Sequence, residues 1–316
     1  MSRIAVTGAS GFVGRRVCAA LRSAGHDVVA VVRQGSAPEG TIPMTVSGLE
    51  DRPGLLAAFD QIDAVIHLAA RVHVMKEEAT DPVAEYQRIN VAGTRKVLAC
   101  AADRAVRHLV FISSIKVNGE SRASPYSEAD TPRPLDPYGQ SKLDAENLIR
   151  SAGANLDWTI LRPPLVYGPQ VGGNFRRLLT LASAGRRCPL PLAGLDNLRS
   201  LIFVGNLADA IRAIVLRPAA ARKLYLVSDD HDTGVSDLLR RLIVALGGRP
   251  RLFQAPEALL REVAAALGRQ ADVDRVLGTL RVNCGLIRGE LGWTPPTGLD
   301  DALSQTALWW RDARGT

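Results

Sequence analysis

The sequence predicts an α/β protein built on a doubly wound parallel sheet, with a smaller, mostly helical substrate-binding lobe. Short runs rich in valine and isoleucine alternate with longer segments of helical period over the first half of the chain. A glycine-rich turn directly follows the first of these runs. With 316 residues, 47% hydrophobic and 22% charged, the chain can form one large domain with an added lobe.

The predicted strands are short apolar runs, and each helix between them carries the chain back to the same edge of the sheet. The strands cover Ile4–Val6, Val28–Val32, Ala64–Leu68, Leu109–Ile112 and Thr159–Leu161. The helices are expected near Val13–Ser23, Pro53–Phe59, Pro82–Asp103 and Pro137–Ala152. Sheets of this kind bind ligands beyond the carboxyl ends of their strands, so the first half is expected to bind a nucleotide.

After about residue 163 the regular alternation stops, and proline and glycine pairs separate shorter elements. We expect a dinucleotide-binding domain over residues 1–168 and a substrate-binding lobe over residues 169–316. The two are interleaved, because later strands are expected to return to the sheet near residues 200–228. The pair Trp309–Trp310 indicates a packed C-terminal helix rather than a site.

Charge and cysteine spacing exclude several classes of function. The formal net charge is +7, but the 39 basic residues are scattered and form no long run, which argues against a nucleic-acid partner. Four isolated cysteines predict neither a zinc site nor a redox pair, and no metal is expected. No apolar run approaches the roughly 18 to 20 residues that cross a bilayer, and no signal peptide precedes the first strand. We therefore expect a cytoplasmic protein with no membrane partner.

The first predicted strand runs into the turn Thr7–Gly14, which reads TGASGFVG. Glycines at Gly8, Gly11 and Gly14 let the chain bend tightly and let backbone N–H groups approach a pyrophosphate at the start of the next helix. At the first strand of an alternating pattern, this turn predicts a dinucleotide site.

The residue that ends the second predicted strand, Arg33, bears on the choice of dinucleotide. NAD sites usually carry an acidic residue there for the ribose 2′-hydroxyl, whereas an arginine can pair with the 2′-phosphate of NADP. No Asp or Glu lies between Val28 and Ala37. We expect NADP, with NAD as the alternative, although a solvated loop arginine would also explain Arg33.

A second motif places a tyrosine and a lysine on one helical face. Asp136 can cap a helix that begins at Pro137, which sets Tyr138 and Lys142 four residues apart. A nearby ammonium favours the phenolate of a tyrosine, whose free pKa is about 10. The spacing indicates a proton-transfer tyrosine, although it also occurs by chance on surface helices. Ser114, at the end of the preceding strand, can hold a substrate oxygen there.

Together these motifs resemble the extended short-chain dehydrogenase/reductases, specifically the nucleotide-sugar epimerase/dehydratase family that includes UDP-glucose 4-epimerases. The resemblance covers nearly the whole chain, becomes weaker toward the C-terminus, and rests on Thr7–Gly14, His67–Ala70, Asn90–Thr94, Ser113–Ser114, Tyr138 with Lys142, Leu161–Pro169, Arg199–Ala208 and Glu290–Trp293. It implies a Rossmann fold and a homodimer formed through the two long helices.

The resemblance also implies site residues. Ser114, Tyr138 and Lys142 would be catalytic, with Lys142 also holding the nicotinamide ribose. Asn174 and Arg199 would hold the sugar nucleotide diphosphate, although ordinary surface polar residues would also explain these loose motifs. The implied cofactor contacts are Gly8, Gly11, Phe12, Val13, Gly14, Leu49 beside the adenine, Leu68, Ala69, Ala70, Lys142, Pro163 and Val166.

Departures from the family pattern narrow the reaction. Family 4,6-dehydratases carry an Asp-Glu pair directly after the catalytic hydroxyl, where this chain has Ile115–Lys116, so dehydration is not expected. Lys116 is expected beside the sugar, where it either contacts a polar or anionic substituent or is a solvated loop lysine. The string Ser114–Glu120 and Arg33 most resemble members that reduce or epimerise 4-keto or 4-hydroxy amino sugars linked to UDP.

We therefore expect an NAD(P)-dependent oxidoreductase or epimerase acting at C4 of a UDP-sugar, by reduction of a 4-keto-hexose or by 4-epimerisation. Two alternatives stay open, a reductase of a small hydrophobic ketone and a non-catalytic sensor that binds NADP. Asn174 and Arg199 favour a diphosphate over the ketone, and the retained Tyr138 and Lys142 argue against the sensor.

Overall fold

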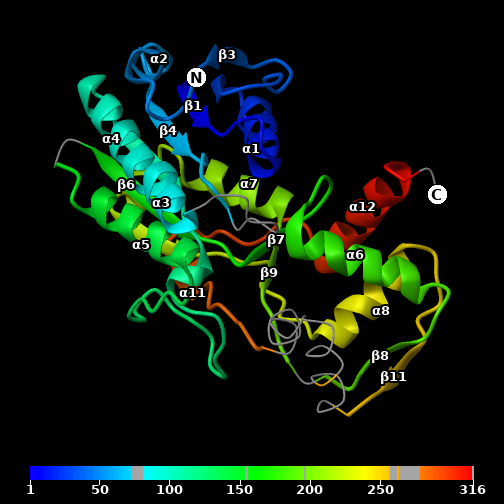
Figure 1. Ribbon diagram of the computed structural model, residues 1–316. Helices are drawn as coiled ribbons and strands as arrows, with labels where there is room; N and C mark the ends of the chain where they lie inside the picture. Colours follow the sequence, from blue (N-terminus) through cyan, green and yellow to red (C-terminus); the bar gives the residue numbers. More distant parts are fainter. Residues whose placement is uncertain (73–80, 154–155, 196, 257–261, 263–277, 315–316) are drawn as a thin grey trace.

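The computed structural model describes residues 1–72, 81–153, 156–195, 197–256, 262 and 278–314. Its centre is a seven-stranded sheet in the order β10-β6-β5-β4-β1-β2-β3, in which every neighbouring pair is parallel. Helices cover both faces, with α1 and α7 on one side and α3, α4 and α5 on the other (Figure 1). The predicted doubly wound α/β fold is confirmed.

The inner strands of this sheet, which have a paired strand on each side, are almost entirely buried. The seven strands are β1 (Arg3–Thr7), β2 (Asp27–Val32), β3 (Ile42–Thr45), β4 (Ala64–His67), β5 (His108–Ile112), β6 (Asp157–Arg162) and β10 (Lys223–Leu226). The sequence analysis missed β3, whose residues are largely exposed and include Pro43. Such a strand is tolerated because β3 lies at the sheet edge and pairs only with β2.

Helix starts in the first half follow a repeated capping pattern. The side chains of Asp51, Asp81 and Asp136 each accept a hydrogen bond from a backbone N–H three residues later, and each helix has proline in its first turn. The helices packed on the sheet are α1 (Phe12–Ser23), α2 (Arg52–Ala58), α3 (Pro82–Tyr86), α4 (Gly93–Asp103), α5 (Pro137–Arg150) and α7 (Val204–Ile214).

The predicted single helix Pro82–Asp103 is wrong in detail. Between α3 and α4 the chain forms a π-helical turn, η1 (Gln87–Ala92), which widens the helix by about one residue. A hydrophobic pattern of period 3.6 cannot reveal such a turn, because the apolar residues on either side keep their own regular spacing.

The remaining elements form a smaller lobe beside the sheet, at the lower right of Figure 1. They are α6 (Gly173–Gly185), β8 (Leu190–Ala193), α8 (Val235–Ala245), β11 (Leu252–Gln254) and α12 (Leu299–Asp312), with η2 (Ile115–Val117), η3 (Pro218–Ala220) and α11 (Gly285–Leu291) nearer the sheet. The lobe has a core of its own, in which Phe175, Leu239 and Leu303 are buried. Trp310 is 3% exposed on α12, so the expectation of a packed C-terminal helix is confirmed.

The strands expected to return near residues 200–228 behave in two ways. β10 joins the central sheet beside β6, as expected. β9 (Leu201–Phe203) instead pairs with β7 (Leu165–Tyr167) in a separate two-stranded sheet, so that part of the expectation is wrong. β8 and β11 form a second small sheet. The division at residue 168 stays a prediction.

Within the described ranges, no helix combines the length and apolar character needed to span a membrane. The same ranges hold no group of three or more His, Cys, Asp or Glu side chains placed to bind a metal ion. Cys18, Cys100 and Cys284 are buried, and Cys188 is exposed.

A buried ion pair joins the central sheet to α5. Arg162, the last residue of β6, donates from Nε and Nη2 to the Glu146 carboxylate at 2.9 and 2.6 Å. The same carboxylate accepts from Ser113 Oγ at 2.5 Å, and Arg162 Nη1 donates to Asn118 Oδ1 at 2.9 Å. Because Glu146 and Arg162 are at most 2% exposed, loss of one partner would leave the other charged group buried without compensation.

Glu146→Ala is expected to lower the free energy of unfolding by about 3–5 kcal/mol, because the Arg162 guanidinium then stays buried without its carboxylate. Urea unfolding followed by circular dichroism measures this change, and Glu146→Gln tests the charge at constant shape. Glu85→Ala, which removes an exposed ion pair with Arg88, is the matched control and should change stability little. Unfolding of Glu146→Ala at the wild-type midpoint would contradict the role given to the pair.

Candidate active site

A cleft of about 1930 Å³ lies between the carboxyl ends of the central strands and the lobe that contains α6 and α8. A pocket for one small molecule has about 300–1,000 Å³, so this cleft has room for two ligands. Every candidate site residue named from the sequence lines it. They are Gly8, Gly11, Phe12, Val13, Gly14, Arg33, Leu49, Leu68, Ala69, Ala70, Ser114, Lys116, Tyr138, Lys142, Pro163, Val166, Asn174 and Arg199.

The turn between β1 and α1 has the shape expected for a pyrophosphate site. Gly8 has a φ of +71°, and a Cβ there would lie 2.8 Å from the backbone nitrogen of Ala69. A Cβ on Gly14 would lie 2.2 Å from the Gly8 carbonyl oxygen. No side chain caps α1 and no acidic residue lies in its first turn, so the partly positive helix start faces the cleft without a competing anion.

A chain of buried polar groups supports this turn from below. His67 Nδ1 lies 2.7 Å from Thr7 Oγ1, and His67 Nε2 lies 3.0 Å from Thr94 Oγ1. Burial lowers the pKa of His67 to about 3, so the imidazole is neutral at physiological pH. The chain joins β1, β4 and α4, which makes His67 a structural residue rather than a proton-transfer group.

Asn90, in the π-helical turn η1, connects the segment after β4 to α5. Its Oδ1 accepts from the Arg71 backbone N–H at 2.8 Å, and its Nδ2 donates to the Arg71 carbonyl at 3.0 Å and to Ser141 Oγ at 2.8 Å. Ser141 Oγ in turn donates to the Tyr138 carbonyl at 2.8 Å. The sequence analysis gave Asn90 no role, and its only signal was membership of the motif Asn90–Thr94.

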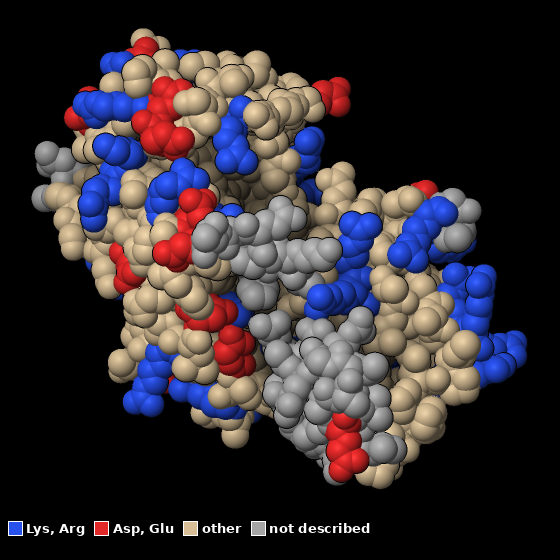
Figure 2. Space-filling view, viewed as in Figure 1, with Lys and Arg blue, Asp and Glu red and all other residues tan. Residues whose placement is uncertain are grey.

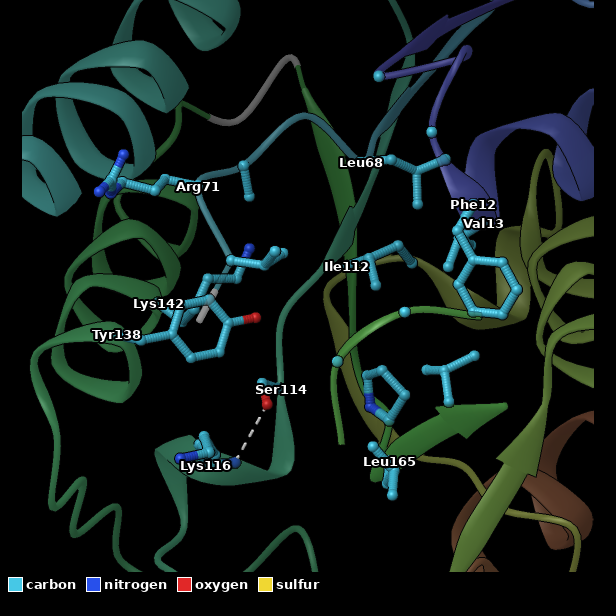
Figure 3. A pocket seen from close by; sticks show the side chains of 18 of the residues that line it. Phe12, Val13, Leu68, Arg71, Ile112, Ser114, Lys116, Tyr138, Lys142 and Leu165 are labelled. Atoms are coloured by element: carbon cyan, nitrogen blue, oxygen red, sulfur yellow. Dashed lines mark hydrogen bonds between the residues drawn. The ribbon is translucent and has the colours of Figure 1, made fainter. Parts of the chain in front are cut away.

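Tyr138 is the second residue of α5, and its hydroxyl points toward Ser114 (Figure 3). Burial raises the pKa of Tyr138 to about 12, and the Ser114 hydroxyl opposes this rise. The spacing to Lys142 predicted the opposite direction, with the ammonium favouring the phenolate. Because the burial of the phenol dominates instead, Tyr138 is protonated at neutral pH and is ready to donate a proton.

Lys142 follows Tyr138 by one helical turn and is 2% exposed. Its Nζ lies 4.0 Å from the centroid of the Phe111 ring on β5. Burial lowers the pKa of Lys142 to about 7, and the Glu146 carboxylate one turn further along α5 opposes this change. At neutral pH Lys142 is therefore only partly protonated, so small electrostatic changes in the cleft alter its average charge.

Lys116 is the middle residue of η2, the short helix that directly follows Ser114. Its backbone N–H donates to Ser114 Oγ at 3.3 Å (Figure 3). Its Nζ donates to Glu120 Oε1 at 2.6 Å and to the Asp136 carboxylate that caps α5. Lys116 ties the turn that carries Ser114 to the helix that carries Tyr138. Its side chain is 22% exposed and lines the cleft, so a contact to the sugar and a solvated loop lysine both stay predictions. Glu120, which also lines the cleft, was missed from the sequence.

The outer ends of the cleft carry the remaining candidates. Arg33 follows β2 on the rim, is exposed, and has no ion pair with any residue in the described ranges. Asn174 is the second residue of α6 on the lobe side. Arg199 Nη1 donates to the Gly278 carbonyl at 2.8 Å, and burial lowers the pKa of its guanidinium against the opposing effect of Glu120.

Comparisons with known proteins agree with this geometry. The sequence profile of the NAD dependent epimerase/dehydratase family matches residues 4–227. The chain is 34% identical over 310 residues to a UDP-glucose 4-epimerase of Vibrio cholerae, covering 96% of this chain and 94% of that protein. It is 30% identical over 265 residues to an N-acetyl-alpha-D-glucosaminyl-diphospho-ditrans,octacis-undecaprenol 4-epimerase of Escherichia coli O157:H7, covering 81% and 76%. The solved structure of MoeE5 in complex with UDP-glucuronic acid and NAD superposes with a TM-score of 0.80 at 26% identity, covering 98% and 99%.

Replacing Lys142 by Met is expected to remove one part of the pH dependence of stability. Between pH 7 and 10.5 the unfolded chain keeps a proton on this side chain that the folded protein has lost. The free energy of unfolding of the wild type therefore increases with pH over this range because of Lys142. The difference in unfolding free energy, wild type minus Lys142→Met, should increase from pH 7 to pH 9 by at most about 1.4 kcal/mol per pH unit.

Urea unfolding of both proteins at pH 7, 8 and 9 measures this difference. Lys96→Met, on the exposed face of α4, is the matched control and should show no such increase. A difference between wild type and Lys142→Met that stays constant with pH would contradict the low pKa of the buried lysine.

Proposed function

We propose, given that this chain belongs to the NAD-dependent epimerase/dehydratase family, that it is an enzyme acting by redox chemistry at C4 of a UDP-linked hexose. The observation that supports this most directly is the placement of Ser114, Tyr138 and Lys142 on one wall of a cleft with room for two ligands. Two outcomes share this chemistry, reduction of a 4-keto-hexose and 4-epimerisation.

The residues at the β1 end of the cleft fit a dinucleotide. Gly8, Gly11 and Gly14 bring backbone N–H groups to the start of α1, where a pyrophosphate would bind. In this proposal Leu49 would lie beside the adenine and Pro163 and Val166 near the nicotinamide, and the backbone at Leu68 would complete the site. All four residues line the cleft. The bound dinucleotide would supply the acceptor and donor of hydride.

Tyr138 performs the proton transfer in this proposal. In the reductive direction Ser114 Oγ holds the 4-keto oxygen while Tyr138 donates its proton to the developing alkoxide, which is a stronger base than a phenolate of pKa about 12. The Lys142 ammonium then stabilises the phenolate that forms. In the oxidative direction the same groups accept the proton from the 4-hydroxyl.

The names of the relatives indicate which substrates to test. One acts on UDP-glucose, and another acts on a sugar joined through a diphosphate to undecaprenol. A hexose on a diphosphate is common to both, and Asn174 and Arg199 line the lobe side where we propose that the diphosphate binds.

We propose that the enzyme works in the cytoplasm as a homodimer through α4 and α5, which lie side by side on one face of the sheet (Figure 1).

Tyr138→Phe is expected to lower kcat by about 10²- to 10⁴-fold, because the proton donor is lost while the ring still packs. NMR of UDP-hexoses measures interconversion, and the absorbance of the reduced dinucleotide measures net reduction. A reductase consumes reduced dinucleotide in step with product, whereas an epimerase shows no net change. Tyr86→Phe, whose ring centroid lies 6.0 Å from that of Tyr138, is the control and should stay near the wild-type rate. Wild-type turnover by Tyr138→Phe would remove Tyr138 from the mechanism.

We further propose NADP as the preferred dinucleotide, because Arg33 on the cleft rim is available to a 2′-phosphate. Arg33→Ala should weaken NADP(H) binding about 10- to 100-fold, as expected for one charge-assisted hydrogen bond, and leave NAD(H) binding nearly unchanged. Fluorescence titration with both dinucleotides measures this, with Arg95→Ala on the outer face of α4 as control. Tighter binding of NAD than of NADP by the wild type would count against the assignment.

A further inference from the structure

The lobe end of the cleft is lined by hydrocarbon side chains. Leu178, Leu181 and Ala184 come from α6, and Val235 and Leu238 from α8. Val235 and Leu238 belong to the lobe core and Leu178 and Leu181 pack against it, so this wall is continuous with a dry interior, and Ala184 is exposed at its end. Among the described residues that line this end, none has an aromatic ring that could stack on a nucleobase.

The hydroxyl groups at this end of the cleft already have protein partners. Thr180 Oγ1 donates to the Arg176 carbonyl at 3.1 Å. Ser200 Oγ donates to Asp232 Oδ1 at 2.5 Å and accepts from the Val282 backbone N–H at 2.9 Å. A polar group buried without a hydrogen bond is unfavourable, so these walls suit a hydrocarbon better than the carbonyl and imide groups of a pyrimidine.

One face of α6 changes in character along its length. Asn174 and Arg177 line the cleft near the helix start, where the macrodipole favours an anion, and Leu178, Leu181 and Ala184 line it further on. Residues at this spacing share one helical face. From Asn174 to Ala184 the face runs about 15 Å at 1.5 Å per residue. It therefore offers sites for an anionic group and then for an apolar chain, in that order.

The surface around this end is basic. Between Pro169 and Leu195 the chain has four arginines and no Asp or Glu, and all four arginines are exposed. In Figure 2, Lys and Arg side chains gather over the lobe that contains α6 and α12, whereas most acidic side chains on this face lie over the sheet. A diphosphate at the start of α6 would meet little electrostatic repulsion there.

We propose that the lobe end of the cleft binds the hydrocarbon chain of a prenyl diphosphate, so that the enzyme acts on a hexose carried by an isoprenoid diphosphate. This inference rests on the proposed chemistry at C4 and changes only the group that carries the sugar. The start of α6 holds the diphosphate, the apolar face of α6 and α8 holds the chain, and the hexose lies beside Ser114 and Tyr138.

The binding test is calorimetric titration of the dinucleotide-loaded protein with farnesyl diphosphate, pyrophosphate, farnesol, palmitate and UDP, below their micellar concentrations. Farnesyl diphosphate should bind at least tenfold more tightly than pyrophosphate or farnesol and should displace UDP. Farnesyl diphosphate binding no better than pyrophosphate would overturn the proposal. Palmitate binding as tightly as farnesyl diphosphate would overturn it in favour of an acyl chain without a diphosphate.

Variants assign this binding to the cleft wall. Leu181→Glu should weaken farnesyl diphosphate binding at least tenfold, and Ala184→Glu, at an exposed position on the same face, should weaken it if Leu181→Glu does not fold. Leu308→Glu is the matched control, because Leu308 is 58% exposed on α12 and does not line the cleft. Equal weakening of UDP and farnesyl diphosphate by the α6 variants would identify a nucleoside site and overturn the inference.

Turnover separates this inference from the proposed function. The wild type is given farnesyl-diphospho-N-acetylglucosamine and UDP-N-acetylglucosamine, and we expect turnover of the first. The kcat/KM for the farnesyl-linked sugar divided by that for the UDP-linked sugar should fall at least tenfold in Leu181→Glu. Turnover of the UDP-sugar alone would overturn the inference and leave the proposed function standing. Binding of farnesyl diphosphate that depends on Leu181, without turnover of either sugar, would support the apolar site and refute 4-epimerisation as the proposed function, leaving reduction of a 4-keto-hexose.

Discussion

Glu146 accepts hydrogen bonds from Arg162 and Ser113 inside the protein, and the geometry of the reacting wall depends on this contact. Glu146 lies one turn after Lys142 on α5, and Ser113 directly precedes Ser114. The ion pair therefore fixes α5, which carries Tyr138 and Lys142, against the ends of β5 and β6. Ser114 follows the end of β5 by two residues. Burying two charges is unfavourable in itself, but the hydrogen bonds that join Glu146 to Arg162 and Ser113 offset this cost and hold the helix against the strands.

Burial also sets the electrostatics of that wall. It moves Tyr138 and Lys142 in opposite directions, raising the pKa of the phenol to about 12 and lowering that of the lysine to about 7. Both shifts favour neutral side chains, so the charge near that wall comes mainly from paired groups, Glu146 with Arg162 and Lys116 with Glu120 and Asp136. Reduction of a ketone generates an alkoxide and then a phenolate, and a partly protonated lysine beside Tyr138 responds to that negative charge. In the proposed function the cleft has a glycine-rich end for a pyrophosphate and a reacting centre, and its lobe end is apolar.

Much of the fold and the membership of the cleft could be predicted from the sequence. Apolar runs located five central strands, and the Asp-Pro step at Asp136 marked the start of α5. All candidate residues line one cleft because strand ends and glycine turns converge at one edge of a parallel sheet. The roles of these residues stay predictions.

The remaining features depend on tertiary contacts that no local pattern encodes. β3 is exposed and contains Pro43, so it carries no apolar run. The π-helical turn at Asn90 is needed only because that side chain reaches Arg71 and Ser141. Lys116 has two carboxylate partners, one of them Asp136, which is twenty residues away in the sequence. The direction of the Tyr138 pKa shift followed from burial, which the spacing to Lys142 could not show.

The most direct measurement follows deuterium from C4 of a UDP-hexose that the protein turns over in ordinary water. In this account the hydrogen on C4 leaves as hydride, and Tyr138 moves only the proton of the 4-hydroxyl. Deuterium NMR of the solvent should therefore detect no label, however many turnovers occur. Release of deuterium to water in step with turnover would show that C4 loses a proton, and would contradict hydride chemistry at this site.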